Sequence, residues 1–122
     1  MSSAPVVVEW SQLAIDRLRV LPKKVQKGLV RKARELSNSD PRRAGKPLTD
    51  DLAGCFRIPY GRYRLIYEVI DSQDEEGKKV VKVRVIFLMV GIRHEGGKRD
   101  IYREFSKMIR SGEIRLDGGR KP

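Results

Sequence analysis

The sequence predicts a single α+β domain in which helices cover one face of an antiparallel sheet. Three observations support this fold class: apolar residues recur at helical spacing in residues 11–37, and they alternate along strands in residues 54–67 and 80–90. A chain of 122 residues is long enough to bury one hydrophobic core without disulfide bonds. We expect residues 1–110 to form the domain and residues 111–122, which contain several glycines, to form a mobile tail.

The N-terminal third predicts a strand followed by two helices. Val6-Val7-Val8 is a β-branched run of strand length, Ser11 can cap a first helix, and Pro22 suits the first turn of a second one. In the second helix, apolar residues at steps of four, four and three form one stripe that is expected to face the core, namely Val25, Leu29, Ala33 and Leu36.

The two helices are strongly basic. Eight Lys or Arg residues and no acidic residue lie between Arg17 and Arg34, and the whole chain carries a formal net charge of +11. Such a balance favours a polyanionic partner, either nucleic acid or an acidic protein, and composition does not choose between them. The other interpretation of these side chains is a solvated helix face.

Residues 54–67 predict a β-hairpin whose turn contains Gly61, a residue that readily adopts a positive φ. Side chains alternate between the two faces of a strand. We therefore expect Phe56 to face the core beneath the helices, and Arg57 and Arg64 to project from the opposite, uncovered face.

The other segments are two loops, a long strand and a final helix. Loops are expected at residues 40–51, which contain helix breakers, and at the acidic residues 71–77. Residues 80–90 predict a strand in the middle of the sheet, and residues 100–110 predict a short helix. Alternation assigns to the core face of the long strand Val81, Val83, Val85, Phe87 and Met89, and to its other face Lys82, Arg84, Ile86, Leu88 and Val90.

Composition argues against a metal site, a disulfide and a membrane span. The single Cys55 cannot form an intrachain disulfide, and one Cys with one His cannot complete a zinc site. No apolar run approaches the roughly 20 residues of a membrane helix, and the first five residues are too short for a signal peptide. We expect a cytoplasmic protein without a metal or another cofactor.

Several motifs follow one another in an informative order: a strand, two basic helices, FRIPYGRYRLIYEV, an apolar strand ending in MVGIRHE, and DIYREF. Over residues 5–110 this combination resembles the RelE/ParE superfamily of bacterial toxins from type II toxin–antitoxin systems. The resemblance implies an antiparallel sheet of about four strands with the active residues on its concave face. In this superfamily the RelE-like branch cleaves messenger RNA on the ribosome, and the ParE-like branch poisons DNA gyrase.

The resemblance to the RNA-cleaving branch implies that Arg64, Arg93 and Tyr102 are catalytic residues. Pro59 is a departure, because a second basic residue of that branch falls on this position. Substrate-binding side chains are expected at Arg57, Arg62, Lys82, Arg84 and His94.

Metal-free cleavage of RNA fits these residue types. The substrate's 2′-hydroxyl attacks the adjacent phosphate, and a cation stabilises the charge that develops there. Arginine matches phosphate oxygens, so Arg64 and Arg93 are expected at the scissile phosphate and Tyr102 at the 2′-hydroxyl. His94 and Glu95 are the neighbouring groups suited to proton transfer.

Each of the three catalytic candidates also has a structural alternative. Arg64 could be an exposed arginine of the sheet, Arg93 could pair with an acidic neighbour, and Tyr102 could be a core aromatic.

Three classes of function are therefore open. The chain could be a ribosome-dependent, metal-free endoribonuclease (an mRNA interferase) that inhibits translation, a gyrase poison of the same fold, or an inactive module that only binds its antitoxin. All three predict an acidic, amphipathic antitoxin segment on the basic surface, with a heterotetramer as one arrangement.

Overall fold

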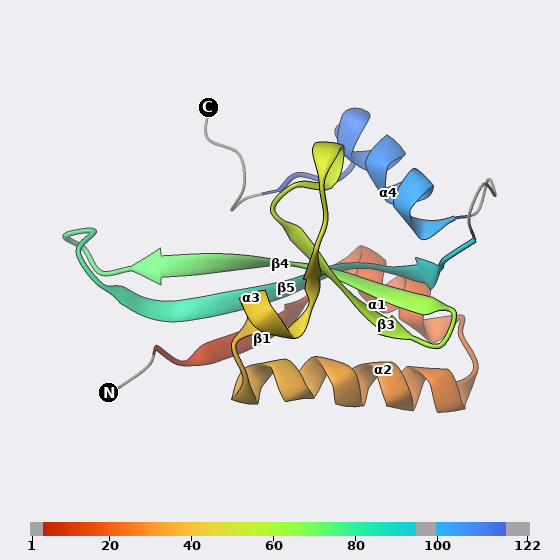
Figure 1. The fold of residues 1–122 in the computed structure, drawn as a ribbon, viewed down its shortest axis with the longest axis horizontal. Coiled ribbons are helices and arrows are strands. Elements are labelled where there is room, and N and C mark those ends of the chain that lie inside the picture. Colours follow the sequence, from red (N-terminus) through yellow and green to blue (C-terminus); the bar gives the residue numbers. More distant parts are fainter. Residues whose placement is uncertain (1–3, 95–99, 117–122) are drawn as a thin grey trace.

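The computed structural model describes residues 4–94 and 100–116, which build a five-stranded sheet with helices on both faces (Figure 1). In chain order the strands are β1 (Val6–Trp10), β2 (Lys46–Pro47), β3 (Cys55–Tyr60), β4 (Tyr63–Gln73) and β5 (Val80–Ile92). Their order across the sheet is β1-β5-β4-β3-β2, so the two longest strands lie side by side in its interior. The predicted α+β fold class is confirmed.

The sheet differs from the predicted one at its two edges. β1 runs parallel to β5, whereas all other neighbouring strands pair antiparallel. The prediction of a purely antiparallel sheet is wrong at this edge, because the long connection between β1 and β5 lets the chain re-enter in the same direction. At the other edge β2 adds a fifth strand, whose two residues are too few to give an alternating pattern.

The helices are α1 (Gln12–Arg19), α2 (Lys23–Glu35), α3 (Pro41–Ala44) and α4 (Ile101–Arg110). The helices α1 and α2 cover one face of the sheet, and α4 covers part of the other (Figure 1). α1 and α2 pack on the face that carries Leu65 and Phe87, as predicted, and α4 packs on the opposite face against Ile66. None of the described helices is long and apolar enough to cross a membrane.

A β-bulge at Leu88 interrupts the alternation of side chains along β5. The pairing with β4 shifts by one residue between Phe87 and Met89, so Leu88 is an extra residue in the ladder. Leu88 and Met89 therefore both lie on the α4 side, whereas Phe87 and Val90 lie on the side of α1 and α2. The faces predicted for Met89 and Val90 are wrong, because strict alternation does not allow for a bulge.

Residues 40–51, predicted to be a loop, contain short regular elements. Besides α3 and β2, residues Asp50–Leu52 form a 3-10 helix. The buried Tyr67 hydroxyl donates a hydrogen bond of 2.6 Å to the Pro41 carbonyl oxygen and so fixes α3 to the sheet. Gly45 lies against the same ring, where a Cβ atom would come within 2.3 Å of the hydroxyl oxygen. These contacts are tertiary, so the local sequence pattern does not reveal them.

The chain after α4 packs against the α4 side of the sheet. Leu116 is buried there and Ile114 is partly buried. The expected mobile tail therefore does not begin at residue 111, because Ile114 and Leu116 pack against the core. Residues 117–122 lie outside the described residues.

Candidate active site

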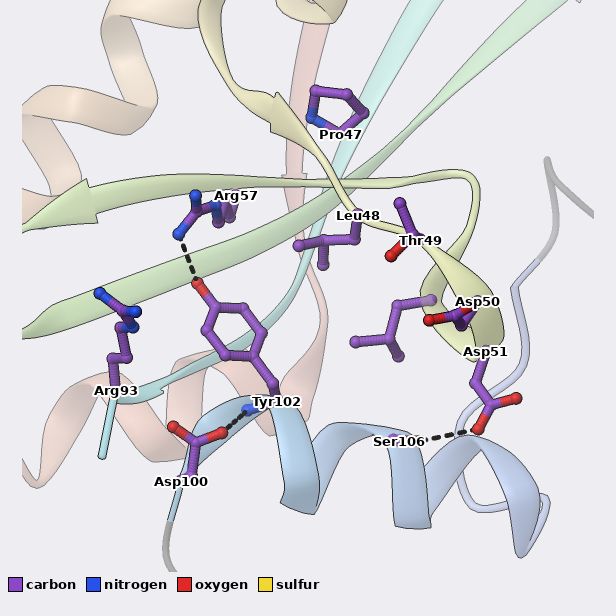
Figure 2. A pocket seen from close by; sticks show the side chains of 11 residues that line it. Pro47, Leu48, Thr49, Asp50, Asp51, Arg57, Arg93, Asp100, Tyr102 and Ser106 are labelled. Carbon is purple, nitrogen blue, oxygen red and sulfur yellow. Dashed lines mark hydrogen bonds between the residues drawn. The ribbon is translucent and has the colours of Figure 1, made fainter. Parts of the chain in front are cut away.

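A pocket of about 640 Å³ opens on the α4 side of the sheet, between α4, β3, the end of β5 and the segment that follows β2 (Figure 2). Three predicted site residues line it together: Arg57, Arg93 and Tyr102. Its other walls come from Pro47, Leu48, Thr49, Asp50, Asp51, Leu52, Asp100 and Ser106. The fold thus gathers basic, phenolic and acidic groups from distant parts of the sequence.

Arg57 and Tyr102 touch each other inside this pocket. The Arg57 Nη1 atom donates a hydrogen bond of 3.3 Å to the Tyr102 hydroxyl oxygen (Figure 2). The Tyr102 ring packs partly against the α4-side core while its hydroxyl faces the pocket. Because the hydroxyl oxygen accepts this bond, its own proton remains a donor for a bound ligand.

Arg93 reaches the pocket because of the bulge at Leu88. Strict alternation would place Arg93 on the same face as Phe87, beneath α1 and α2. The extra residue re-aims the end of β5, so Arg93 lines the pocket on the same side as Arg57. The Arg93 backbone N–H also donates to the Arg62 carbonyl oxygen over 2.9 Å, which anchors this end of the strand.

Arg64 is buried, and it does not line the pocket. Only 8% of the residue is exposed, and its Nη1 atom donates to the carbonyl oxygens of Gly61 and Tyr63 at 2.8 and 2.7 Å. The expectation that Arg64 is an exposed arginine of the sheet face is wrong, because its guanidinium folds back onto the hairpin turn. Its Nε atom is buried and has no hydrogen-bond partner among the described residues.

Arg62 and His94, two predicted substrate-binding residues, line a neighbouring cavity of about 800 Å³. Arg93 belongs to the walls of both cavities, so they meet at this side chain. The Arg62 guanidinium carbon lies 5.6 Å from the centroid of the Tyr63 ring, a cation–π distance. These residues border the main pocket without lining it.

Lys82 and Arg84 lie farther along β5 and line neither cavity. The Arg84 guanidinium forms a two-pronged ion pair with the Glu9 carboxylate on β1, with N–O distances of 2.7 and 3.0 Å. Hydrogen bonding from Arg84 lowers the pKa of the Glu9 carboxyl below its ordinary value. Arg84 thus joins β1 to β5, and the structure does not bring these two predicted residues to the others.

The pocket is also lined by carboxylates that the sequence patterns did not assign to the site. Asp51 accepts a hydrogen bond of 3.0 Å from the Ser106 hydroxyl, which ties the segment before β3 to α4. Asp50 has a φ of 56°, a left-handed conformation that Asp tolerates better than most residues. The acidic pair was visible in the sequence, but its place over α4 depends on tertiary structure. Glu95, expected to act in proton transfer, lies outside the described residues.

The chemistry available in the pocket is that of arginine and phenol groups beside carboxylates. Arg57 and Arg93 can bind phosphate oxygens, and the Tyr102 hydroxyl can donate to a substrate oxygen. In the described part of the chain, no group of three or more His, Cys, Asp or Glu side chains could hold a metal ion.

Comparisons with known proteins define the class of this fold and site. A family model described as "ParE toxin of type II toxin-antitoxin system, parDE" matches residues 8–86. The toxin RelG of Mycobacterium tuberculosis is 36% identical over 81 residues, which cover 66% of this chain and 88% of the relative. The chain therefore belongs to the ParE toxin family, within the RelE/ParE superfamily of type II toxins. The matched residues include Arg57 and Arg64 and end before Arg93 and Tyr102.

Solved structures of toxins from toxin–antitoxin systems also resemble this chain. The toxin–antitoxin complex RelBE2 of M. tuberculosis contains a chain that is 34% identical, with a TM-score of 0.56, covering 74% of this chain and 100% of that one. The isolated RelE toxin of E. coli is 30% identical, with a TM-score of 0.51, covering 84% of this chain and 97% of that one.

Proposed function

We propose that this toxin is a ribosome-dependent, metal-free endoribonuclease that cleaves messenger RNA and so inhibits translation. The observation that carries the proposal is the convergence of Arg57, Arg93 and Tyr102 on one pocket. Two guanidinium groups and a phenol suit a phosphodiester with a neighbouring 2′-hydroxyl. The likeness to solved toxins also supports the proposal, because it covers 100% of the matched chain of RelBE2 and 97% of RelE.

In the proposed reaction, the 2′-oxygen of the substrate gives up its proton to water and forms a bond to phosphorus. The bond from phosphorus to the 5′-oxygen breaks, and the 5′-oxygen takes a proton from water. The products are a 2′,3′-cyclic phosphate and a 5′-hydroxyl. Arg93 stabilises the negative charge on the phosphate oxygens, and Arg57 positions the same phosphate together with Tyr102, which orients the 2′-hydroxyl.

The role we propose for Arg64 changes with its place in the structure. Its guanidinium holds the carbonyl oxygens of Gly61 and Tyr63, so it fixes the turn of the β3–β4 hairpin. The Arg62 carbonyl in that same turn receives the Arg93 N–H. Arg64 would therefore support the phosphate-binding arginine through the backbone.

We propose that a cognate antitoxin neutralises the toxin by covering its basic surface. The solved complexes RelBE2 and RelBE each contain a related toxin with an antitoxin. In this chain, α2 has no acidic residue in its first turn. It presents five exposed basic side chains, namely Lys23, Lys24, Lys27, Arg31 and Arg34. An acidic partner would complement this surface.

A gyrase poison is the second candidate function. Two observations favour it: the matching family model is described as a ParE toxin, and Pro59 occupies a position that is basic in the RNA-cleaving branch. Under this alternative, the pocket arginines would contact protein or DNA and perform no chemistry.

Brief induction of the chain in a bacterium distinguishes these functions. We expect growth arrest, relieved by the antitoxin, and new RNA 5′ ends within translated messages. Gyrase-linked DNA breaks without new RNA ends would support the second candidate. Normal growth at confirmed soluble expression would contradict both.

A further inference from the structure

We propose that Asp100 is a positioning residue, which fixes the phosphate-binding Arg93 relative to Tyr102. The inference rests on the proposed function, because it concerns the geometry of the same site. Asp100 itself need not touch the substrate.

The Asp100 carboxylate binds two separate segments of backbone. Its Oδ1 atom accepts a hydrogen bond of 2.7 Å from the N–H of His94, the residue that follows Arg93. Its Oδ2 atom accepts bonds from the N–H groups of Tyr102 and Arg103 at 3.1 and 3.3 Å and so caps α4. One carboxylate therefore joins the end of β5 to the start of α4; Figure 2 shows its bond to the Tyr102 N–H.

This junction connects the pocket-lining side chains through short links. Arg93 is held on one side by its own N–H bond to the Arg62 carbonyl oxygen, and on the other by the His94 bond to Asp100. Tyr102 is held through its N–H by Asp100 and through its hydroxyl by Arg57. Only 9% of Asp100 is exposed, so water competes weakly for these bonds.

A helix cap alone does not require this residue. Serine caps helices about as well as aspartate, because its hydroxyl also accepts from the second and third N–H groups. The serine side chain is one atom shorter than that of aspartate and offers a single oxygen. It can keep the bonds at Tyr102 and Arg103, and it cannot also reach the His94 N–H.

The substitution Asp100→Ser therefore separates capping from positioning. Asp40→Ser is the matched control, because Asp40 caps α3 through a bond of 3.1 Å to the Arg42 N–H and does not line the pocket. We expect both variants to fold and to melt near the wild-type temperature. Faster amide exchange at His94 in Asp100→Ser alone would report the lost link.

For cleavage of ribosome-bound message, we expect Asp100→Ser to lower kcat by about 10- to 100-fold with little change in KM, since small misplacements of aligned groups cost rates of this order. Asp40→Ser should cleave like the wild type. In an Arg93→Ala background, Asp100→Ser should cause little further loss, because its effect passes through Arg93.

Three outcomes would overturn the inference. These are wild-type cleavage by Asp100→Ser, an equal loss with and without Arg93, or a loss explained by a much lower melting temperature. A wild-type protein that cleaves no RNA would instead overturn the proposed function, and this inference with it.

Discussion

The Arg57 guanidinium donates a hydrogen bond to the Tyr102 hydroxyl over 3.3 Å, between side chains 45 residues apart in the sequence. The bond connects β3 to α4. Each of the two side chains therefore helps to fix the position of the other in the pocket.

Coupling between Arg57 and Tyr102 is the first prediction. Tyr102→Phe removes the hydroxyl, and Arg57→Ala removes the donor. Each should lower cleavage by about 10- to 100-fold, and the double variant should lose less than the product of the two, because contacting residues are not independent. Single-turnover cleavage of ribosome-bound message by the four proteins is the measurement. Losses that multiply fully would show that the two side chains act separately.

Arg64 gives a prediction about stability. Arg64→Ala removes a buried guanidinium that serves two turn carbonyls, so we expect a loss of about 1–3 kcal/mol in the free energy of unfolding. The exposed Arg115, which makes no such bonds among the described residues, provides the charge-matched control, and Arg115→Ala should change stability by less than about 0.5 kcal/mol. Urea denaturation measures both. An unchanged stability in Arg64→Ala together with lost cleavage would assign Arg64 to the chemistry itself.

Tyr67 gives a prediction about alkaline pH. Burial raises the pKa of its phenol to about 12, from the ordinary tyrosine value of 10.0, because the ionised form is poorly solvated inside the core. The folded state therefore holds this proton more tightly than the unfolded state does. Its contribution to stability is fully present below pH 10 and is lost as the pH rises from 10 to about 12.

The substitution Tyr67→Phe isolates this effect. The variant should be less stable at pH 7 by about 1–3 kcal/mol, because the Pro41 carbonyl oxygen loses its donor. The difference from the wild type should shrink between pH 10 and 12. Unfolding curves at pH 8 and 11 measure this change, and a constant difference across that interval would contradict the raised pKa of Tyr67.

The helix-facing side of the sheet could be predicted from the sequence, because it depends on regular spacing. The stripe that includes Leu29 and the hairpin alternation that includes Phe56 each place side chains by local periodicity. The end of β5 could not be predicted in this way. The bulge at Leu88 reverses the faces beyond it and turns Arg93 toward the pocket, and nothing in the local pattern marks that extra residue.

The candidate site was predictable only where local spacing or the family resemblance identifies a residue. Arg57 and Tyr102 follow from the strand and helix that carry them, together with the family resemblance. The roles of Asp51 and Asp100 depend on contacts between residues that are not neighbours in the sequence, which spacing does not encode. The sequence predicts the strand that carries Arg64, but the direction of its long side chain is set by the turn carbonyls and not by alternation.

The central claim is that Arg93 stabilises the scissile phosphate of ribosome-bound message. The most direct measurement compares the single-turnover cleavage rates of the wild type, Arg93→Ala and the charge-matched Arg115→Ala. Arg93 is exposed, so its truncation should leave the fold intact while lowering cleavage on the order of 100-fold or more, and Arg115→Ala should cleave like the wild type. Cleavage by Arg93→Ala at the wild-type rate would contradict the claim.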